Sequence, residues 1–527
     1  MKRVIPITDV LATAMMILFL LSVYEGINDV SSCSVPFMMS GIYFVTRLAV
    51  MMFPGKVSDI FLICVIVAVC AEILTGFSQI VLKNGFLAYT LKGSFSHSAL
   101  LAGFLAICIP VLLAASSLSE SKSIKMISVY VSLPAFLIVP ATLSRAALLA
   151  LAISCAVLYR VRIKEWIMVK KRYLIFIPVV LLCMVLYFAK KTSADGRLYL
   201  DKISIRTMSS GNILGAGLGN FESEFGHEQT RYLESRLFNG DNGVELNPKY
   251  EKERLLADCP NLSYNEYLQI GIEAGPLAMA FFMAILAVSI ISAVSNKRIW
   301  GYGLLSFAVF AFFSYPFYCL EFQILIPVIT ALCNSSESAS RKPNSIIAAC
   351  SFLCALSMAM VVLCIPRISM QNKMKEVWKD INPLYEGGHI GIVVGEFEKI
   401  DNIEDYPAAC LFAYGHSLNQ IGEFEKSDSI LAIGANKSSD PMFWNIMGNN
   451  SVGLGNYDEA EQLYIHAFHM IPNRLYPLYL LARLYDAECD TARFLDMAER
   501  VETFKPKVES IRTERLRAEI LEIKSGY

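Results

Sequence analysis

The chain has few charged residues: Asp, Glu, Lys and Arg make up 18% of its 527 residues, whereas hydrophobic residues make up 55%. Its mean hydropathy of +0.48 exceeds what a soluble globular protein needs to fill a core. A soluble enzyme is therefore excluded, and we expect an integral membrane protein in contact with lipid. The formal net charge is only -1, so no overall positive field would attract nucleic acid.

The sequence also lacks the spacings that mark metal sites and nucleotide loops. None of the 14 cysteines lies in a Cys-x-x-Cys pair, and most fall inside apolar segments, where cysteine behaves as a small hydrophobe. The glycines of "GAGLGN" at 215–220 do not match G-x-G-x-x-G, and no G-K-S/T follows them. We expect no metal and no cofactor. The glycines form a tight turn that either brings backbone amides close to a substrate or is purely structural.

Long hydrophobic segments are abundant. Segments of roughly 17 to 23 residues suffice to cross about 30 Å of hydrocarbon, and they predict an all-α, polytopic protein with about 11 transmembrane helices. The first of them, "MKRVIPITDVLATAMMILFLLSVYEG", lacks a small-x-small cleavage site, so we interpret it as a span and not as a signal peptide. The segments lie near residues 6–25, 36–54, 57–77, 98–117, 125–143, 146–160, 173–189, 275–295, 300–317, 319–334 and 345–365.

Basic residues in alternate loops predict the orientation of these spans. They occur in "GK" at 55, "ESKSIK" at 120–125, "RVRIKEWIMVKKR" at 160–172, "NKR" at 296–298 and "SRKP" at 340–343. Basic loops stay in the cytoplasm, so the N-terminus is predicted to lie there too. The intervening segments, among them a large loop at about 190–270 and everything after Pro366, are predicted to face outward.

From about residue 370 the composition becomes that of a soluble protein. The stretch "WNIMGNNSVGLGNYDEAEQLYIHAFHMIP", from Trp444 to Pro472, belongs to a period of about 34 residues and resembles the tetratricopeptide consensus. We therefore predict a transmembrane domain at 1–368 and an α-solenoid of tetratricopeptide-like repeats at 369–527. Such a solenoid either binds a peptide or protein partner on its concave surface, or merely stabilises or dimerises the chain.

Four outward-facing motifs occur in a recognisable order. They are "GSFSHSALLAGFL" at 93–105, "LSRAALLALA" at 143–152, "SADGRLYLDKIS" with "ILGAGLGNF" at 193–221, and "LSYNEYLQIGIEAGP" at 262–276. Over residues 90–335 they resemble the superfamily of O-antigen ligases and polymerases, which includes bacterial protein O-oligosaccharyltransferases.

The resemblance implies a GT-C-like, metal-independent glycosyltransferase of the bacterial inner membrane. Its donor would be a glycan on undecaprenyl diphosphate, and its repeats would lie in the periplasm. Three acceptors occur in the superfamily: lipid A core for a ligase, another glycan for a polymerase, and a protein hydroxyl for an oligosaccharyltransferase. The repeats favour the ligase or the protein-directed enzyme, because a peptide-binding array has a use there.

Guanidinium groups suit the diphosphate of such a donor, because they stay charged and fork onto phosphate oxygens. Arg145 and Arg197 match arginines of the superfamily that are taken to bind the diphosphate, and Arg206 is a further candidate. His97 occupies an Asn/His position of the superfamily's first loop. It either contributes to donor binding or makes a structural hydrogen bond.

The base that would deprotonate the acceptor is harder to assign. The superfamily's last motif usually opens with His-Asn, whereas Tyr264 precedes Asn265 here. A phenol with a pKa near 10 is a poor base at neutral pH. Glu266 and Glu273 lie seven residues apart and share a helix face with Gln269. We rank Glu273 first as the catalytic residue, because it matches the glutamate of the superfamily's E-x-G segment, and Glu266 second. Tyr264 at the position of the motif histidine and His227 of the large loop are further candidates, and Asn265 and Gln269 would position a sugar or the acceptor.

A hypothesis of a different class remains open. The chain could be a non-catalytic membrane scaffold whose repeats recruit envelope partners, and the missing motif histidine favours this interpretation. Both arginine motifs and Glu273 favour the enzyme. The polar stretch at 220–256 is either a recognition element for acceptor or glycan, or a loose cover.

Overall fold

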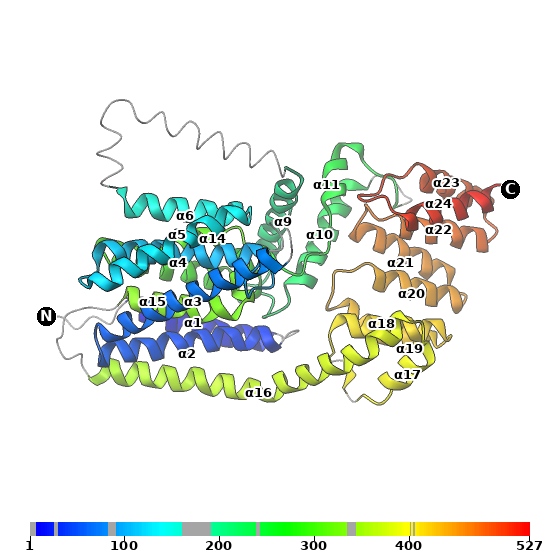
Figure 1. Cartoon of the computed structure of the whole chain (residues 1–527). Helices are drawn as coiled ribbons and strands as arrows, with labels where there is room; N and C mark the ends of the chain where they lie inside the picture. Colours follow the sequence, from blue (N-terminus) through cyan, green and yellow to red (C-terminus); the bar gives the residue numbers. More distant parts are fainter. Residues whose placement is uncertain are drawn as a thin grey trace, which may run out of the picture.

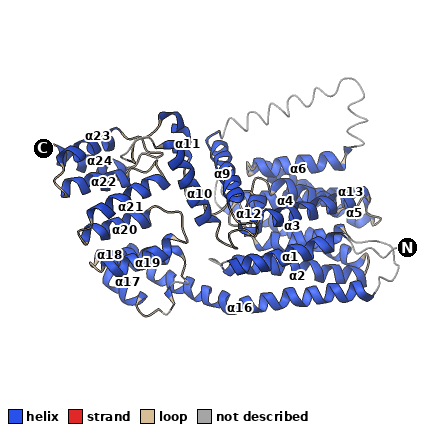
Figure 2. Ribbon diagram, turned by 180° about the vertical axis from the view of Figure 1, so that it is seen from behind, coloured by secondary structure: helices blue, strands red, loops and turns tan. Residues whose placement is uncertain are grey.

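The computed structural model describes residues 7–25, 30–82, 91–160, 191–238, 243–334, 344–400, 402–403 and 406–527. It is 79% helical. The described ranges contain no strand, and their only strand-like pairing is an isolated bridge between Phe238 and Leu246 (Figure 2). The predicted all-α class is confirmed.

Apolar helices form a bundle in the N-terminal part of the chain. Six described helices are long and apolar enough to cross a membrane. They lie in α2 (Val30–Met52), α3 (Lys56–Leu82), α4 (Ser98–Leu118), α5 (Lys122–Ala141), α13 (Pro276–Ser295) and α16 (Asn344–Glu386). The shorter apolar helices are α1 (Ile7–Glu25), α6 (Arg145–Leu158), α14 (Trp300–Phe310) and α15 (Leu320–Cys333). All of them overlap predicted segments, although α14 ends before the predicted end at 317 and α16 continues well past the predicted end at 365. The predicted span at 173–189 lies outside the described residues. The number of about 11 spans stays a prediction.

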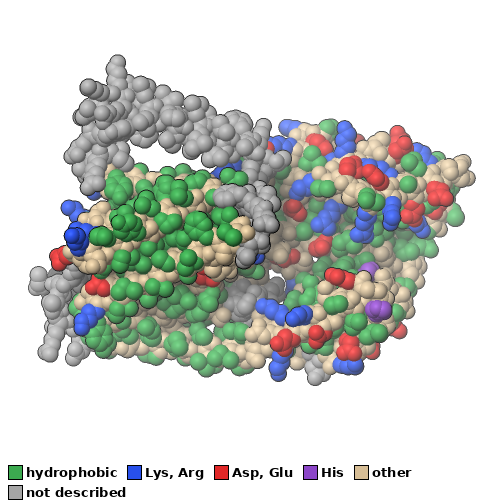
Figure 3. All heavy atoms as spheres, in the orientation of Figure 1, with side chains coloured by type: hydrophobic (Ala, Val, Ile, Leu, Met, Phe, Trp, Pro, Cys, Tyr) green, Lys and Arg blue, Asp and Glu red, His purple; other side chains and the backbone are tan. Residues whose placement is uncertain are grey.

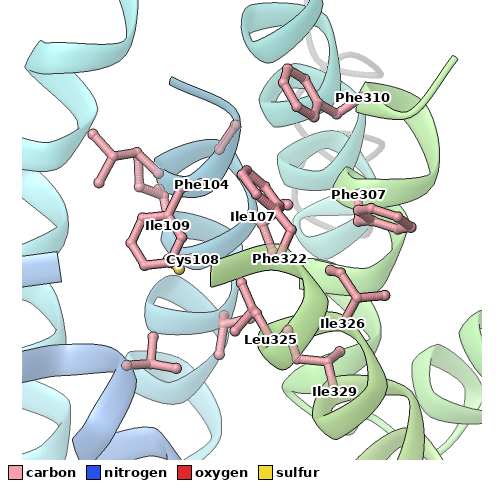
Figure 4. Packing of buried hydrophobic residues seen from close by; sticks show 14 of the residues in the cluster. Phe104, Ile107, Cys108, Ile109, Phe307, Phe310, Phe322, Leu325, Ile326 and Ile329 are labelled. Carbon is pink, nitrogen blue, oxygen red and sulfur yellow. The ribbon is translucent and has the colours of Figure 1, made fainter. Parts of the chain in front are cut away.

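Small residues let the neighbours of α4 approach it closely. A Cβ at Gly103 would lie 2.3 Å from the ring carbon Cζ of Phe310, and one at Gly303 would lie 2.6 Å from a methyl group of Val111. Aromatic and branched side chains of α4, α14 and α15, Phe322 among them, interdigitate around these contacts (Figure 4). Helices in lipid associate through such close packing, because lipid tails are as apolar as the side chains themselves.

A buried ion pair joins α1 to α2. Arg47 is fully buried and donates from Nε and Nη2 to the two carboxylate oxygens of Asp9, each at 2.9 Å. The Tyr43 hydroxyl donates to the same carboxylate at 2.6 Å. Each partner neutralises the other, which is the condition for burying charge in a membrane-embedded bundle.

The two ends of the bundle differ in what they carry. At the end that holds the predicted cytoplasmic loops, Trp300 Nε1 donates to the hydroxyl of Ser58 at 2.8 Å. The opposite end carries α9 (Lys191–Ser210) and α12 (Glu266–Glu273) and faces the part of the molecule formed by the described residues of 390–527, which we call the C-terminal half of the structure (Figure 1). Hydrophobic side chains cover the visible flank of the bundle, whereas charged side chains of both signs cover the C-terminal half (Figure 3). A bundle in lipid joined to a domain in water requires this distribution.

Residues 191–238 and 243–261, which we call the outer segment, form a packed helical unit. Besides α9 it contains α10 (Phe221–Leu237), the 3-10 turn η2 (Pro248–Tyr250) and α11 (Glu251–Leu256). Ile203, Phe221, Phe225 and Tyr232 are buried in a common core between these elements. The interpretation of 220–256 as a loose cover is therefore wrong for the part that the structure describes.

The C-terminal half consists of short helices that pack side by side in pairs (Figure 1). Its helices are α17 (Ile390–Phe397), α18 (Ala408–Gln420), α19 (Phe424–Ala435), α20 (Met442–Gly453), α21 (Tyr457–Met470), α22 (Tyr476–Ala487), α23 (Thr491–Thr503) and α24 (Ile511–Lys524). Gly448 lies directly against the ring of Tyr464, where a Cβ would be 2.3 Å from Cε1. The tetratricopeptide class of these pairs stays a prediction. So does the domain boundary at 368, a position that α16 crosses without interruption.

The C-terminal half is braced against the outer segment. Arg254 of α11 is 2% exposed and donates to the carbonyl oxygens of Pro472 at 3.0 Å and Lys505 at 2.7 Å. In return, the Asn473 side chain donates to the carbonyl oxygens of Arg254 at 3.0 Å and Ala257 at 2.8 Å. Buried polar groups satisfied in both directions hold two units in a defined relation.

Candidate functional site

A cavity of about 1430 Å³ opens at the end of the bundle that carries α9 and α12. Its walls come from α1, α2, α9 to α13, α15, the segment 315–318 and three residues of the C-terminal half, Lys437, Pro506 and Lys507. The residues that the sequence predicted and that line this cavity are Arg197, Tyr264, Asn265, Glu266, Gln269 and Glu273.

The polar motif at 262–276 forms a short helix beside the cavity. Asn265 caps α12, because its Oδ1 accepts hydrogen bonds from the amides of Tyr267 at 3.1 Å and Leu268 at 3.3 Å. Tyr264, which precedes the cap, has a φ of 55°. This left-handed conformation costs a residue other than glycine roughly 1–2 kcal/mol. The chain therefore turns sharply as it enters α12.

Glu266 lies at the first turn of α12 and is only 5% exposed. Its Oε1 accepts a hydrogen bond from the Phe317 amide at 2.7 Å, and its own amide donates to the carbonyl oxygen of Ala311 at 2.9 Å. Burial raises the pKa of Glu266 to about 8, the Phe317 amide opposes this shift, and the charge of Glu273 adds to it. The carboxyl group is therefore mostly protonated at neutral pH.

Glu273 lies at the other end of α12 and is half-buried. Its Oε1 accepts a hydrogen bond from Gln269 Nε2 at 2.7 Å, while Gln269 Oε1 accepts one from the Ser263 amide at 2.9 Å. Gln269 is thus fixed at both ends of its amide, and it orients the Glu273 carboxylate.

Arg197 projects from α9 into the cavity and is surrounded by aromatic and cationic groups. Its Nη1 donates to the carbonyl oxygen of Phe313 at 2.9 Å, and its guanidinium carbon lies 5.7 Å from the ring centroid of Tyr264. Burial lowers the pKa of Arg197, and the charge of Arg145 lowers it further. Arg145 begins α6 and does not itself line the cavity. Two guanidinium groups close enough to repel each other favour an anion beside them.

Asp201 belongs to the same site, although the sequence reasoning passed over it. It follows Arg197 by one turn of α9, and its carboxylate hydrogen-bonds the Asn265 side chain. Burial raises the pKa of Asp201, and the Asn265 hydrogen bond and the Arg197 charge oppose the shift. Asn265, 8% exposed, therefore links α9 to α12. The spacing of four residues from Arg197 on a helix was a signal that could have identified Asp201.

The glycine-rich turn at 214–219 packs against the C-terminal end of α12. Gly215 and Gly275 both have positive φ, 82° and 92°, and a Cβ at Gly275 would lie 2.0 Å from the carbonyl oxygen of Ile213. The amides of Ala216 and Gly217 donate to carbonyl oxygens at the end of α12, at 2.8 and 3.0 Å. Since these amides already have partners in the protein, the structural interpretation of the turn is favoured over substrate binding.

Two predicted residues lie elsewhere. Arg206 donates from Nε to Glu228 Oε1 at 2.9 Å, in an ion pair between α9 and α10. His97 caps α4, where its Nδ1 accepts a hydrogen bond from the Ala99 amide at 3.2 Å. Neither residue lines the cavity, and their predicted part in donor binding is not supported by these positions.

The cavity has walls of two kinds. The wall formed by α1, α2 and α13 is apolar and includes Met15 and Phe19 of α1, Met39 of α2 and Ile285 of α13. The part formed by α9 and α12 carries the cation and the carboxyl groups. This arrangement suits an amphiphilic ligand with an anionic head and an apolar tail. In the described ranges, no group of three or more His, Cys, Asp or Glu side chains could hold a metal ion.

A family model described as O-antigen ligase matches residues 129–283. The match begins within α5 and ends within α13, so it includes Arg145, the Arg197 motif and all of α12. A search among curated proteins found no match. The match and the six candidate spans support a multi-pass membrane protein similar to O-antigen ligases, a family consistent with glycosyl transfer.

Proposed function

We propose that the protein is an inner-membrane glycosyltransferase that moves a glycan from undecaprenyl diphosphate to a periplasmic acceptor, in the manner of an O-antigen ligase. The observation that carries this proposal is a single cavity that combines an apolar wall, a half-buried guanidinium group and an oriented carboxylate. The family match over residues 129–283 supports the same class of reaction.

The donor would lie along both walls. The diphosphate is placed beside Arg197, with the charge of Arg145 behind it, because guanidinium groups fork onto phosphate oxygens. The polyprenyl chain then follows the apolar wall formed by α1 and α2, in contact with Met15, Phe19 and Met39. In this arrangement the scissile bond lies at the polar wall of the cavity.

Transfer requires one proton to be removed and one leaving group to be stabilised. The acceptor hydroxyl attacks the anomeric carbon, its proton passes to the Glu273 carboxylate, and the bond from the anomeric carbon to the diphosphate oxygen breaks. The diphosphate leaves with the bonding electrons, and the guanidinium groups stabilise its charge. Glu273 is preferred to Glu266 as the base because it is more accessible, whereas Glu266 is mostly protonated and engaged with the Phe317 amide.

The residues that the C-terminal half contributes to the cavity wall lie where we expect the acceptor to enter. Lys437 and Lys507 line the cavity from turns of the predicted repeats, and Lys507 Nζ pairs with Asp258 Oδ2 at 2.7 Å. An acceptor approaching from the periplasm would pass these turns. The family model for O-antigen ligases favours lipid A core as the acceptor, and this choice makes the protein a ligase. A protein acceptor or another glycan is the alternative. The transfer is proposed to need no metal.

A deletion strain of the producing bacterium tests the proposal. We expect lipid-linked glycan to accumulate and the surface polysaccharide to lose its attachment to lipid A. Short lipopolysaccharide carrying one repeat unit would indicate a polymerase, and loss of glycoprotein staining would indicate the protein-directed enzyme. Unchanged lipid-linked glycan would instead favour the non-catalytic scaffold.

A further inference from the structure

Three tyrosines form a cluster in the wall of the cavity next to Arg197. The rings of Tyr264 and Tyr315 meet edge to face, with centroids 5.0 Å apart and an interplanar angle of 88°. Tyr318 continues the cluster, 6.1 Å from Tyr315 at an angle of 75°. All three line the cavity, and the Arg197 guanidinium carbon lies 5.7 Å from the Tyr264 centroid. We call Tyr264, Tyr315 and Tyr318 the tyrosine cluster.

The backbone around these rings is held at several points. The segment 311–318 is bonded at Ala311 and Phe317 by Glu266, and at Phe313 by Arg197. The Gln323 side chain donates to the carbonyl oxygen of Phe317 at 2.7 Å. Tyr264 itself has the strained φ of 55°. Next to it, the Ser263 amide donates to Gln269 Oε1 and the Ser263 hydroxyl donates to the carbonyl oxygen of Asn265, each at 2.9 Å. A strained residue held in this way beside a cavity indicates a side chain placed for a ligand.

Packing does not account for the exposure of these rings. Tyr318 is 68% exposed and Tyr264 is 39% exposed, whereas aromatic residues of the bundle core such as Phe310 and Phe322 are fully buried. Interfacial tyrosines that anchor a protein in lipid also stay exposed, but they face the membrane. The tyrosine cluster instead lines the same cavity as Glu273.

We propose that the tyrosine cluster is a subsite for the sugar ring attached to the donor's diphosphate, an inference that rests on the proposed function. The C–H faces of a pyranose pack on aromatic rings, and its hydroxyl groups form hydrogen bonds with phenol hydroxyls and a guanidinium group. The neighbouring Arg197 determines which ring of the glycan occupies the subsite. If Arg197 holds the diphosphate, the ring attached directly to that diphosphate lies against Tyr264. Glycan specificity at this subsite would then come from aromatic stacking.

Binding of two lipids to the full chain in nanodiscs tests this subsite. The probes are undecaprenyl diphosphate and undecaprenyl diphosphate-N-acetylglucosamine, and the observable is the ratio of their Kd values. We expect the wild type to prefer the lipid with the sugar, and Tyr318→Leu to lower that preference about 3- to 10-fold, the range expected for loss of one aromatic contact. Tyr318→Phe keeps the ring and should keep the preference. Tyr130→Leu, at a 67% exposed tyrosine of α5 outside the cavity, is the control and should change neither Kd.

The outcomes separate the two proposals. Equal affinity of the wild type for both lipids, or an unchanged preference in Tyr318→Leu, would overturn the sugar subsite while leaving the donor proposal in place. A Tyr318→Leu variant that keeps the preference but binds a free acceptor glycan more weakly would also overturn it, because the ring bound would then be the acceptor's. Failure of the wild type to bind either lipid would overturn the proposed function itself.

Discussion

At the scale of single residues, the difference in burial gives the two glutamates of α12 different proposed roles. Glu266 and Glu273 line one cavity, but Glu266 is 5% exposed and bonded to the Phe317 amide, whereas Glu273 is half-buried and bonded to Gln269. Desolvation favours the neutral form of a carboxyl group, so the more accessible of the pair is the better proton acceptor. Glu266 then acts as a clamp on the segment 311–318.

Replacement of the proposed base tests this division. Glu273→Gln keeps the size of the side chain and the hydrogen bond to Gln269 but cannot accept a proton. We expect glycan transfer to fall about 100-fold or more, in the range of general-base catalysis, with normal amounts of protein in the membrane. Complementation of a deletion strain, scored by the amount of glycan transferred, gives the measurement. Glu321→Gln, at a glutamate outside the cavity on α15, is the control and should complement fully.

The buried carboxyl group predicts a dependence of stability on pH. Because the pKa of Glu266 is raised to about 8, the folded state holds a proton that the unfolded state has released above pH 4.5. The contribution of Glu266 to stability therefore decreases between pH 4.5 and 8, by about 1.4 kcal/mol per pH unit within that window. Glu266→Gln should remove this part of the slope and should unfold at a higher temperature than the wild type at pH 8. Parallel slopes for the two proteins between pH 5 and 8 would contradict the assignment.

At the scale of elements, the sequence predicted the apolar helix α13 near 275–295, but it predicted neither the bounds of α12 nor how α12 joins its neighbours. Asn265 as a cap and Pro276 at the start of α13 are local signals, which a single sequence carries. The bond from the Phe317 amide to Glu266 spans 51 residues, and no local pattern encodes such a pairing. The nearness of Arg197 to Tyr264 has the same origin, because it depends on how α9 packs against α12. Both are consequences of tertiary structure.

The interlocked turns beside α12 give a test at this scale. Gly275→Ala adds a Cβ where the carbonyl oxygen of Ile213 would be 2.0 Å away, at a φ of 92°. We expect a loss of about 3 kcal/mol, from backbone strain and the clash together. Gly55→Ala provides the control, because Gly55 has a φ of 85° but no atom within 4 Å of the added carbon, so only strain remains. Thermal unfolding in detergent should rank the wild type above Gly55→Ala, and Gly55→Ala above Gly275→Ala; equal midpoints for the two variants would contradict the interlock.

At the scale of the whole molecule, hydropathy and basic loops located the described apolar helices, because the thickness of a bilayer dictates their length. The contact between the outer segment and the C-terminal half could not be predicted in this way. It depends on Arg254, which reads in sequence as an ordinary surface residue of "EKERLL" yet is buried under Pro472 and Lys505. The predicted repeats therefore pack against the outer segment and help to form the wall of the cavity.

Removal of the Arg254 guanidinium should loosen this brace. Arg254→Met keeps much of the volume but leaves the two carbonyl oxygens without their donor, at a cost of about 2–4 kcal/mol. We expect trypsin to cleave the variant within residues 231–254 under conditions where the wild type resists. Arg515→Met, at an exposed arginine of α24, is the control. Resistance of Arg254→Met equal to that of the control would show that the brace does not depend on this residue.

The central claim is that one cavity binds a lipid-linked glycan through Arg197 and transfers it. Transfer of glycan from undecaprenyl diphosphate to lipid A core by the purified protein in liposomes, with a chelator present, tests it most directly. The account predicts transfer by the wild type, release of undecaprenyl diphosphate in equal amount, and loss of both in Arg197→Ala. Full transfer by Arg197→Ala, or none by the wild type under conditions where it binds the donor, would contradict it.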